Sequence, residues 1–143
     1  MSKVECDVSR CSGCLACIVA CIDQHYDETD SEAVSPRIYE IRKFAHSGLM
    51  LYSTRSCLHC EDAACISACR FGALVRDERN FVIPVREKCT GCRMCQKACP
   101  HDVPRLDQSG KIVKCDGCSV RVATGLEPAC VRACNTGALA VTD

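Results

Sequence analysis

Cysteine spacing constrains this chain more than any other feature of its sequence. The 143 residues include 17 Cys, of which 16 fall into four groups of four, here called quartets. The chain has no Trp, and aromatic residues make up only 4% of it, so an ordinary apolar core would be small for this length. We therefore expect the cysteines, together with whatever they bind, to form the core.

The quartet spacings suit iron–sulfur clusters better than zinc. The quartets are Cys11, Cys14, Cys17 and Cys21; Cys57, Cys60, Cys65 and Cys69; Cys89, Cys92, Cys95 and Cys99; and Cys115, Cys118, Cys130 and Cys134. The first and third have the C-x2-C-x2-C-x3-C spacing in which three close cysteines hold one cubane and the fourth, a helical turn later, reaches another. Zinc sites separate two CxxC pairs by a dozen or more residues, and only the fourth quartet, C-x2-C-x11-C-x3-C, comes near this spacing. The pattern predicts four [4Fe–4S] clusters, with a structural zinc module as the alternative.

Charge and motif content exclude several functional classes. Eighteen Lys+Arg balance 18 Asp+Glu, so there is no basic excess that would favour nucleic-acid binding. No apolar run approaches the roughly 20 residues of a membrane span, and no secretory signal is expected at the N-terminus. Nucleotide-binding glycine motifs are missing as well. Since every quartet is complete, no iron would be open to a substrate, and we expect no catalytic residues.

The repeated quartets predict an α+β fold of short helices and small β-hairpins. Each quartet should begin in a loop and continue into a helix, at Leu15–Gln24, Ala64–Ala68, Met94–Ala98 and Ala129–Ala133. Strand-forming runs separated by turn residues predict two hairpins, made of Arg37–Phe44 with Leu49–Tyr52 and of Ala73–Arg76 with Phe81–Val85. We expect the first hairpin to belong to the core more than to a docking surface, and its tip at His46–Gly48 to be the part that contacts a partner.

Two stretches carry a resemblance to a known family. They are Cys57-Leu-His-Cys-Glu-Asp-Ala-Ala-Cys, and Lys114-Cys-Asp-Gly-Cys followed by Gly125-Leu-Glu-Pro-Ala-Cys-Val-Arg-Ala-Cys. With these stretches and its order of quartets, the chain resembles the four-cluster electron-transfer subunits of molybdenum and tungsten bis-pterin oxidoreductases. Dimethyl sulfoxide reductase, formate dehydrogenase and tungsten aldehyde oxidoreductase have subunits of this type. The central part also resembles a two-cluster bacterial ferredoxin.

The resemblance implies tandem ferredoxin-like units, one inserted in the other. Residues 1–35 and 106–143 would form an outer unit, residues 36–56 a hairpin link, and residues 57–105 a central two-cluster unit. The family's ligand pattern, carried over to this sequence, gives four sets: set 1, Cys11, Cys14, Cys17 and Cys134; set 2, Cys115, Cys118, Cys130 and Cys21; set 3, Cys57, Cys60, Cys65 and Cys99; and set 4, Cys89, Cys92, Cys95 and Cys69.

The same resemblance implies a function and partners. The chain would relay electrons between a molybdenum- or tungsten-pterin catalytic subunit and another redox partner, which is a further electron-transfer or flavin subunit or copies of the chain itself. A free-standing or filament-forming polyferredoxin-type carrier is the alternative. Reduced cysteines and oxygen-sensitive clusters suit assembly in the cytoplasm of an anaerobe. Export to the periplasm with a partner is the alternative location.

Five residues near the quartets raise narrower expectations. Cys6 lies outside the quartets and should pack as a small apolar side chain; a labile or redox-active thiol is the alternative. His59 should pack and form hydrogen bonds rather than bind metal. Arg10, Lys88 and Lys114 each precede the first Cys of a quartet, where they could offset cluster charge or simply be solvated.

Overall fold

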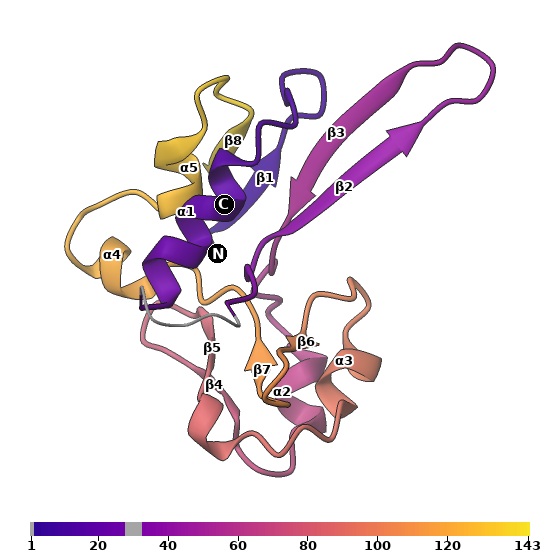
Figure 1. The fold of residues 1–143 in the computed structure, drawn as a ribbon. Coiled ribbons are helices and arrows are strands. Elements are labelled where there is room, and N and C mark those ends of the chain that lie inside the picture. Colours follow the sequence, from indigo (N-terminus) through magenta and orange to yellow (C-terminus); the bar gives the residue numbers. More distant parts are fainter. Residues whose placement is uncertain (1, 28–32) are drawn as a thin grey trace.

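Short helices and two-stranded antiparallel sheets, joined by loops, make up the chain (Figure 1). The computed structural model describes residues 2–27 and 33–143. The elements are β1 (Lys3–Cys6), α1 (Ala16–His25), β2 (Ile38–Lys43), β3 (Met50–Arg55), α2 (Ala64–Ala68), β4 (Leu74–Arg76), β5 (Val82–Pro84), a 3-10 turn (Arg86–Lys88), α3 (Met94–Ala98), β6 (Arg105–Leu106), β7 (Ile112–Val113), α4 (Ser119–Ala123), α5 (Ala129–Ala133) and β8 (Leu139–Thr142). The predicted α+β class is confirmed. None of the helices in the described ranges is long and apolar enough to cross a membrane.

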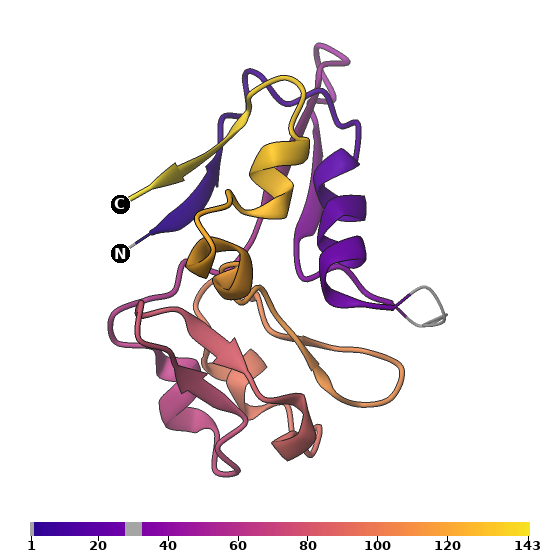
Figure 2. The same cartoon turned by 90° about the vertical axis from the view of Figure 1, so that its left-hand side faces the viewer.

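The elements gather in two lobes (Figures 1 and 2). In the terminal lobe, β1 pairs with β8 so that Cys6 lies opposite Leu139, and α1 packs against α5. In the central lobe, α2 packs against α3 beside the β4–β5 hairpin and the short β6–β7 pair. The first and fourth quartets therefore lie in one lobe, and the second and third in the other.

Cysteines contribute to the core of both lobes, as the composition predicts. The central core contains the buried residues Ala63, Cys65, Ala73, Leu74, Val82, Cys89 and Ile112. The terminal core contains Cys17, Cys21, Cys130 and Leu139. In both cores apolar side chains pack around the thiols, so the cysteines lie at the centre of the packing.

β2 and β3 form an arm, residues 38–55, that projects away from both lobes (Figure 1). The strands are in register from Ile38 opposite Arg55 to Lys43 opposite Met50. Residues 40–50 are all exposed, so the expectation that this hairpin belongs to the core is wrong for its outer half. Only its base is packed, because Thr54 is buried and the Tyr39 and Tyr52 rings stack with centroids 6.4 Å apart.

Candidate metal centres

Three hollows in the structure are each lined by at least four cysteines. The cysteines are Cys57, Cys60, Cys65 and Cys99 in one hollow; Cys69, Cys89, Cys92 and Cys95 in another; and Cys11, Cys14, Cys17 and Cys134, joined by Cys6, in the third. Each encloses between 330 and 370 Å³ of space free of protein atoms, solvent at the mouth included. In each hollow, three cysteines of one quartet meet a fourth from a different quartet, as in predicted sets 3, 4 and 1.

The cysteines of predicted set 2 interact in the terminal lobe. Cys21 and Cys130 are both buried there. A hydrogen bond from one thiol to the other, together with burial, raises the pKa of Cys21, and the same hydrogen bond lowers the pKa of Cys130 to about 6. Cys115 lies close enough to raise the pKa of Cys21 further. Burial is the main cause of the raised pKa of Cys118, to which Cys130 likewise contributes. A bound iron would displace the proton of this thiol–thiol hydrogen bond.

Left-handed backbone shapes the loops that carry these cysteines. Gly13 and Leu15 have φ of 73° and 65°, and Gly91 and Arg93, at the matching positions of the third quartet, have φ of 77° and 64°. A left-handed conformation costs a residue with a side chain roughly 1–2 kcal/mol. Successive backbone N–H groups in such turns form concave sites for anions, including iron–sulfur clusters. The two loops therefore have a shape that suits a bound anionic cluster.

Backbone N–H groups also point at individual sulfurs. The N–H of His59 donates to Sγ of Cys57 over 3.3 Å, and the N–H of Ala73 donates to Sγ of Cys69 over 3.2 Å. Hydrogen bonds of this kind to ligand sulfurs are among the factors that set the reduction potential of an iron–sulfur cluster. The candidate metal ligands are therefore all cysteine sulfurs, and backbone amides already donate hydrogen bonds to two of these sulfurs.

These residues fit [4Fe–4S] clusters better than zinc. A zinc site takes four thiolates from two CxxC loops, whereas each hollow takes three from one quartet and one from another. Soft thiolates in apolar surroundings are the ligands that iron–sulfur clusters use. When bound, a cubane of this type accepts and releases one electron.

Lys114 is the buried cation of the central lobe. It is 2% exposed, and its ammonium donates to the carbonyl oxygens of Val82 and Cys115. Burial raises the pKa of Cys65, and raises that of Cys115 to about 12, while the charge of Lys114 offsets part of both increases. Of the three cations named from the sequence, Lys114 alone is buried; Arg10 and Lys88 are exposed, as the solvated alternative predicts.

His59 links the loop of set 3 to the loop of set 2. Its side chain is 1% exposed, and its Nδ1 accepts a hydrogen bond of 2.9 Å from the N–H of Val82. The proton of the ring therefore lies on Nε2, which faces Sγ of Cys115 at 3.9 Å. Burial, reinforced by the charge of Lys114, lowers the pKa of His59 to about 3, so the ring is neutral. The predicted role in packing and hydrogen bonding is confirmed.

Sequence reasoning missed Arg37, which lies at the base of the arm. Its guanidinium is 2% exposed and donates from Nε to Oγ1 of Thr54 over 2.7 Å and from Nη1 to Oγ of Ser56 over 2.9 Å. Nη1 also lies 3.8 Å from Sγ of Cys130. A buried cation beside a thiol favours the thiolate form, which is the form that binds iron. No pattern in the sequence marks this arginine among the others.

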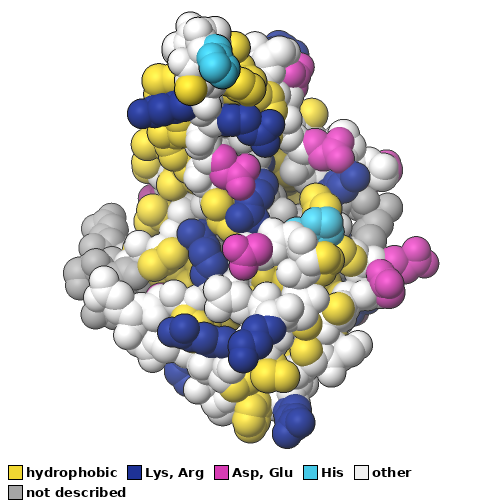
Figure 3. Space-filling view, turned by 90° about the vertical axis from the view of Figure 1, so that its right-hand side faces the viewer, with side chains coloured by type: hydrophobic (Ala, Val, Ile, Leu, Met, Phe, Trp, Pro, Cys, Tyr) yellow, Lys and Arg dark blue, Asp and Glu magenta, His cyan; other side chains and the backbone are white. Residues whose placement is uncertain are grey.

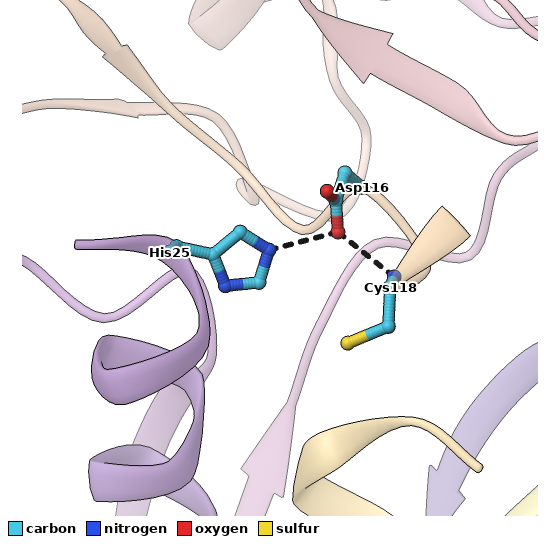
Figure 4. Close-up of side chains that lie close together, drawn as sticks. All are labelled: His25, Asp116 and Cys118. Carbon is cyan, nitrogen blue, oxygen red and sulfur yellow. Dashed lines mark hydrogen bonds and ion pairs between the residues drawn. The ribbon is translucent and has the colours of Figure 1, made fainter. Parts of the chain in front are cut away.

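Among the described residues, one further group resembles a metal site, made of His25, Asp116 and Cys118 (Figure 4). His25 Nδ1 is 2.8 Å from the carbonyl oxygen of Cys21, and Nε2 is 2.9 Å from Oδ1 of Asp116. Both partners are acceptors, so both ring nitrogens carry a proton and neither has a lone pair for a metal. The group is therefore an ion pair that joins the end of α1 to the loop of the fourth quartet.

Comparison with known proteins places these features in a family. A family model described as "4Fe-4S dicluster domain" matches residues 49–143, which include the second, third and fourth quartets. The chain belongs to this family. The [4Fe–4S] cluster is thus its cofactor, and 16 cysteines in four sets fit four such clusters.

Individual relatives of this chain are subunits of oxidoreductases. It is 41% identical to the B subunit of the anaerobic dimethyl sulfoxide reductase of Haemophilus influenzae and 39% identical to the same subunit of Escherichia coli, each match covering 93% of this chain and 69% of the relative. It is 36% identical to the iron–sulfur subunit of the nitrate-inducible formate dehydrogenase of Escherichia coli, over 93% of this chain and 51% of that subunit. The predicted identity as an electron-transfer subunit of this type is confirmed.

Proposed function

We propose that the protein carries four [4Fe–4S] clusters on sets 1 to 4 and relays electrons without acting on a substrate itself. The observation that carries this proposal is that, in each of the three hollows, three cysteines of one quartet meet one cysteine of a different quartet. Four thiolates fill the four iron corners of a cubane, so no corner is left for a substrate.

The route of the electrons follows from a nested arrangement of two ferredoxin-like units. We place sets 1 and 2 in an outer unit, residues 1–35 and 106–143, and sets 3 and 4 in a central unit, residues 57–105, with residues 36–56 as the link. Within the sequence of the outer unit, β7 (Ile112–Val113) packs on the central core. The ring of His59 and the ammonium of Lys114 lie between cysteines of set 3 and Cys115 of set 2. This contact supports set 2 and set 3 as the step at which electrons pass from one unit to the other.

The catalytic partner is a molybdenum- or tungsten-pterin subunit in this proposal. Its support is the similarity to proteins named as subunits of dimethyl sulfoxide reductase and formate dehydrogenase. A further electron-transfer or flavin subunit, or another copy of the chain, would be the second redox partner. The cytoplasm is the proposed location, and fractionation of native cells would distinguish it from residence in the periplasm after export with a partner.

The arm supports a docking role toward that catalytic subunit. Its outer half exposes four large apolar side chains, between 38% and 53% exposed, on Ile41, Phe44, Leu49 and Met50. A two-stranded hairpin by itself is marginally stable in water, and clustered exposed apolar residues mark interaction surfaces. Figure 3 shows hydrophobic side chains mixed with Lys and Arg over the arm. Residues 41–50 contain Lys and Arg but no Asp or Glu, so the arm would fit an apolar groove edged by carboxylates.

Anaerobic purification of the untagged protein from its native source tests the proposal. We expect about 16 iron per chain, no zinc, and a large partner that carries molybdenum or tungsten. Iron without any partner would favour the free-standing carrier, and a colourless protein containing zinc would favour the zinc module.

Two surface variants then test the arm. Phe44→Asp should reduce recovery of the catalytic subunit at least tenfold while the iron content stays unchanged. Val120→Asp on α4 is the matched control, because Val120 is 73% exposed and lies outside the arm. Equal recovery of the partner with both variants would show that the arm does not dock.

A further inference from the structure

The hollow of set 1 holds more thiols than a cubane needs. Five cysteines line it: Cys6, Cys11, Cys14, Cys17 and Cys134. A [4Fe–4S] cluster has four iron corners, and set 1 supplies one thiolate for each. The hollows of sets 3 and 4 are lined by four cysteines apiece. Cys6 is therefore a surplus thiol at one of the proposed cluster sites.

The position of Cys6 directs its side chain toward that hollow. Cys6 is the last residue of β1 and lies opposite Leu139 of β8, a buried residue that also lines the hollow. Side chains alternate between the faces of a strand, and Cys6 shares with Val4 the face that packs on the terminal core, while Glu5 between them is exposed. The predicted packing of Cys6 as a small side chain is confirmed, and the same packing brings its sulfur to the cluster site.

Within the hollow, Cys6 is a neighbour of Cys11. The two residues flank a tight turn in which the N–H groups of Arg10 and Cys11 donate to the carbonyl oxygen of Asp7 over 3.1 and 3.2 Å. This turn reverses the direction of the chain, so that the side chains of Cys6 and Cys11 both line the hollow. The two thiols are close enough for a hydrogen bond between them.

We propose that Cys6 is a reserve ligand for the iron corner that is assigned to Cys11. When Cys6 binds, an iron–sulfur bond to Cys6 forms, the bond to Cys11 breaks, and the proton of the Cys6 thiol passes to the sulfur of Cys11. No electron is transferred, and the cubane keeps four thiolates throughout. The exchange lets set 1 retain its cluster when the sulfur of Cys11 is unavailable. This inference rests on the proposed assignment of set 1.

Four variants of the full chain, purified anaerobically with any partner that accompanies it, test the reserve ligand. They are Cys6→Ala, Cys11→Ala, the double variant Cys6→Ala with Cys11→Ala, and Cys14→Ala as the control for a ligand without a reserve. The readouts are iron per chain and the low-temperature electron paramagnetic resonance signal of a three-iron cluster, which appears when a cubane loses one corner. Neither readout depends on the activity of a complex.

We expect Cys6→Ala and Cys11→Ala each to retain the iron of the native protein, about 16 per chain, without a three-iron signal. The double variant and Cys14→Ala should both lose between one and four iron per chain. Equal losses in Cys11→Ala and in the double variant would overturn the reserve ligand and leave the assignment of set 1 intact. A Cys11→Ala protein that is insoluble while Cys14→Ala is recovered would also overturn it. Full iron in Cys14→Ala would instead overturn the assignment of set 1, and the role of Cys6 with it.

Discussion

Replacing Gly91 by Ala tests the close backbone contact beside the third quartet. Gly91 has φ of +77°, and an added Cβ would lie 2.7 Å from the carbonyl oxygen of Gly110. The left-handed backbone costs a residue with a Cβ roughly 1–2 kcal/mol, and overpacking adds about 1–3 kcal/mol. Because a backbone carbonyl cannot rotate away as a side chain can, both costs apply. We expect Gly91→Ala to lower the free energy of unfolding by about 2–5 kcal/mol.

Gly110→Ala is the matched control for this variant. Gly110 has φ of +78°, but its added Cβ would meet nothing within 4 Å, so the expected loss is about 1–2 kcal/mol. For a chain of this size each kcal/mol lowers the melting temperature by roughly 2–4 °C. Gly91→Ala should therefore melt several degrees below Gly110→Ala, and it should also lose iron from set 4. Anaerobic circular dichroism and iron analysis measure both effects. Equal melting temperatures would refute the argument from the contact.

Two further variants address the charges beside the cysteines. Lys114→Met removes a buried positive charge, so the reduction potential of a neighbouring cluster should fall by on the order of 100 mV. Redox titration monitored by electron paramagnetic resonance measures the potentials. Unchanged potentials for every cluster would contradict this expectation. For His25, burial lowers the pKa of the ring, but the hydrogen bond and charge of Asp116 outweigh burial and leave that pKa raised. The ion pair therefore gives its full stabilisation at pH values below about 6.5, the pKa of His in the unfolded chain. The stabilisation is lost as the pH rises through the higher pKa that His25 has in the folded protein. The difference in melting temperature between the native protein and His25→Gln should be largest near pH 5.5 and shrink toward pH 9, and a difference that grows with pH would show that the pair is not the cause.

Cysteine spacing made much of the local structure predictable. The helices expected at Ala64–Ala68, Met94–Ala98 and Ala129–Ala133 occur with these bounds, and the helix expected at Leu15–Gln24 occurs at Ala16–His25. The reason is physical: an x3 spacing places two cysteines on one helical face, and in three of the four cases a turn with a Gly precedes the helix. The helix α4 was missed, because its sequence Ser-Val-Arg-Val-Ala carries β-branched residues and its start has no side-chain cap.

What the sequence could not predict depends on contacts between distant segments. The ion pair of His25 and Asp116 joins residues 91 positions apart, and Arg37 reaches Cys130 across 93 positions. Neither residue stands out by type or spacing. The exposure of the arm was also mispredicted, because the number of apolar residues in its two strands is equally compatible with a buried hairpin and with an exposed hairpin that binds a partner.

The pairing of β1 with β8 has a consequence for the order of events during synthesis. Cys11 leaves the ribosome well before Cys134, and at about 5–20 residues per second the delay is on the order of 10 s. During that interval set 1 has Cys11, Cys14 and Cys17 but lacks Cys134, whereas sets 3 and 4 are complete once Cys99 has emerged. Cluster delivery to the growing chain would therefore fill the centre first, and the thiols nearest the N-terminus are the ones that most need protection from stray metal and oxygen.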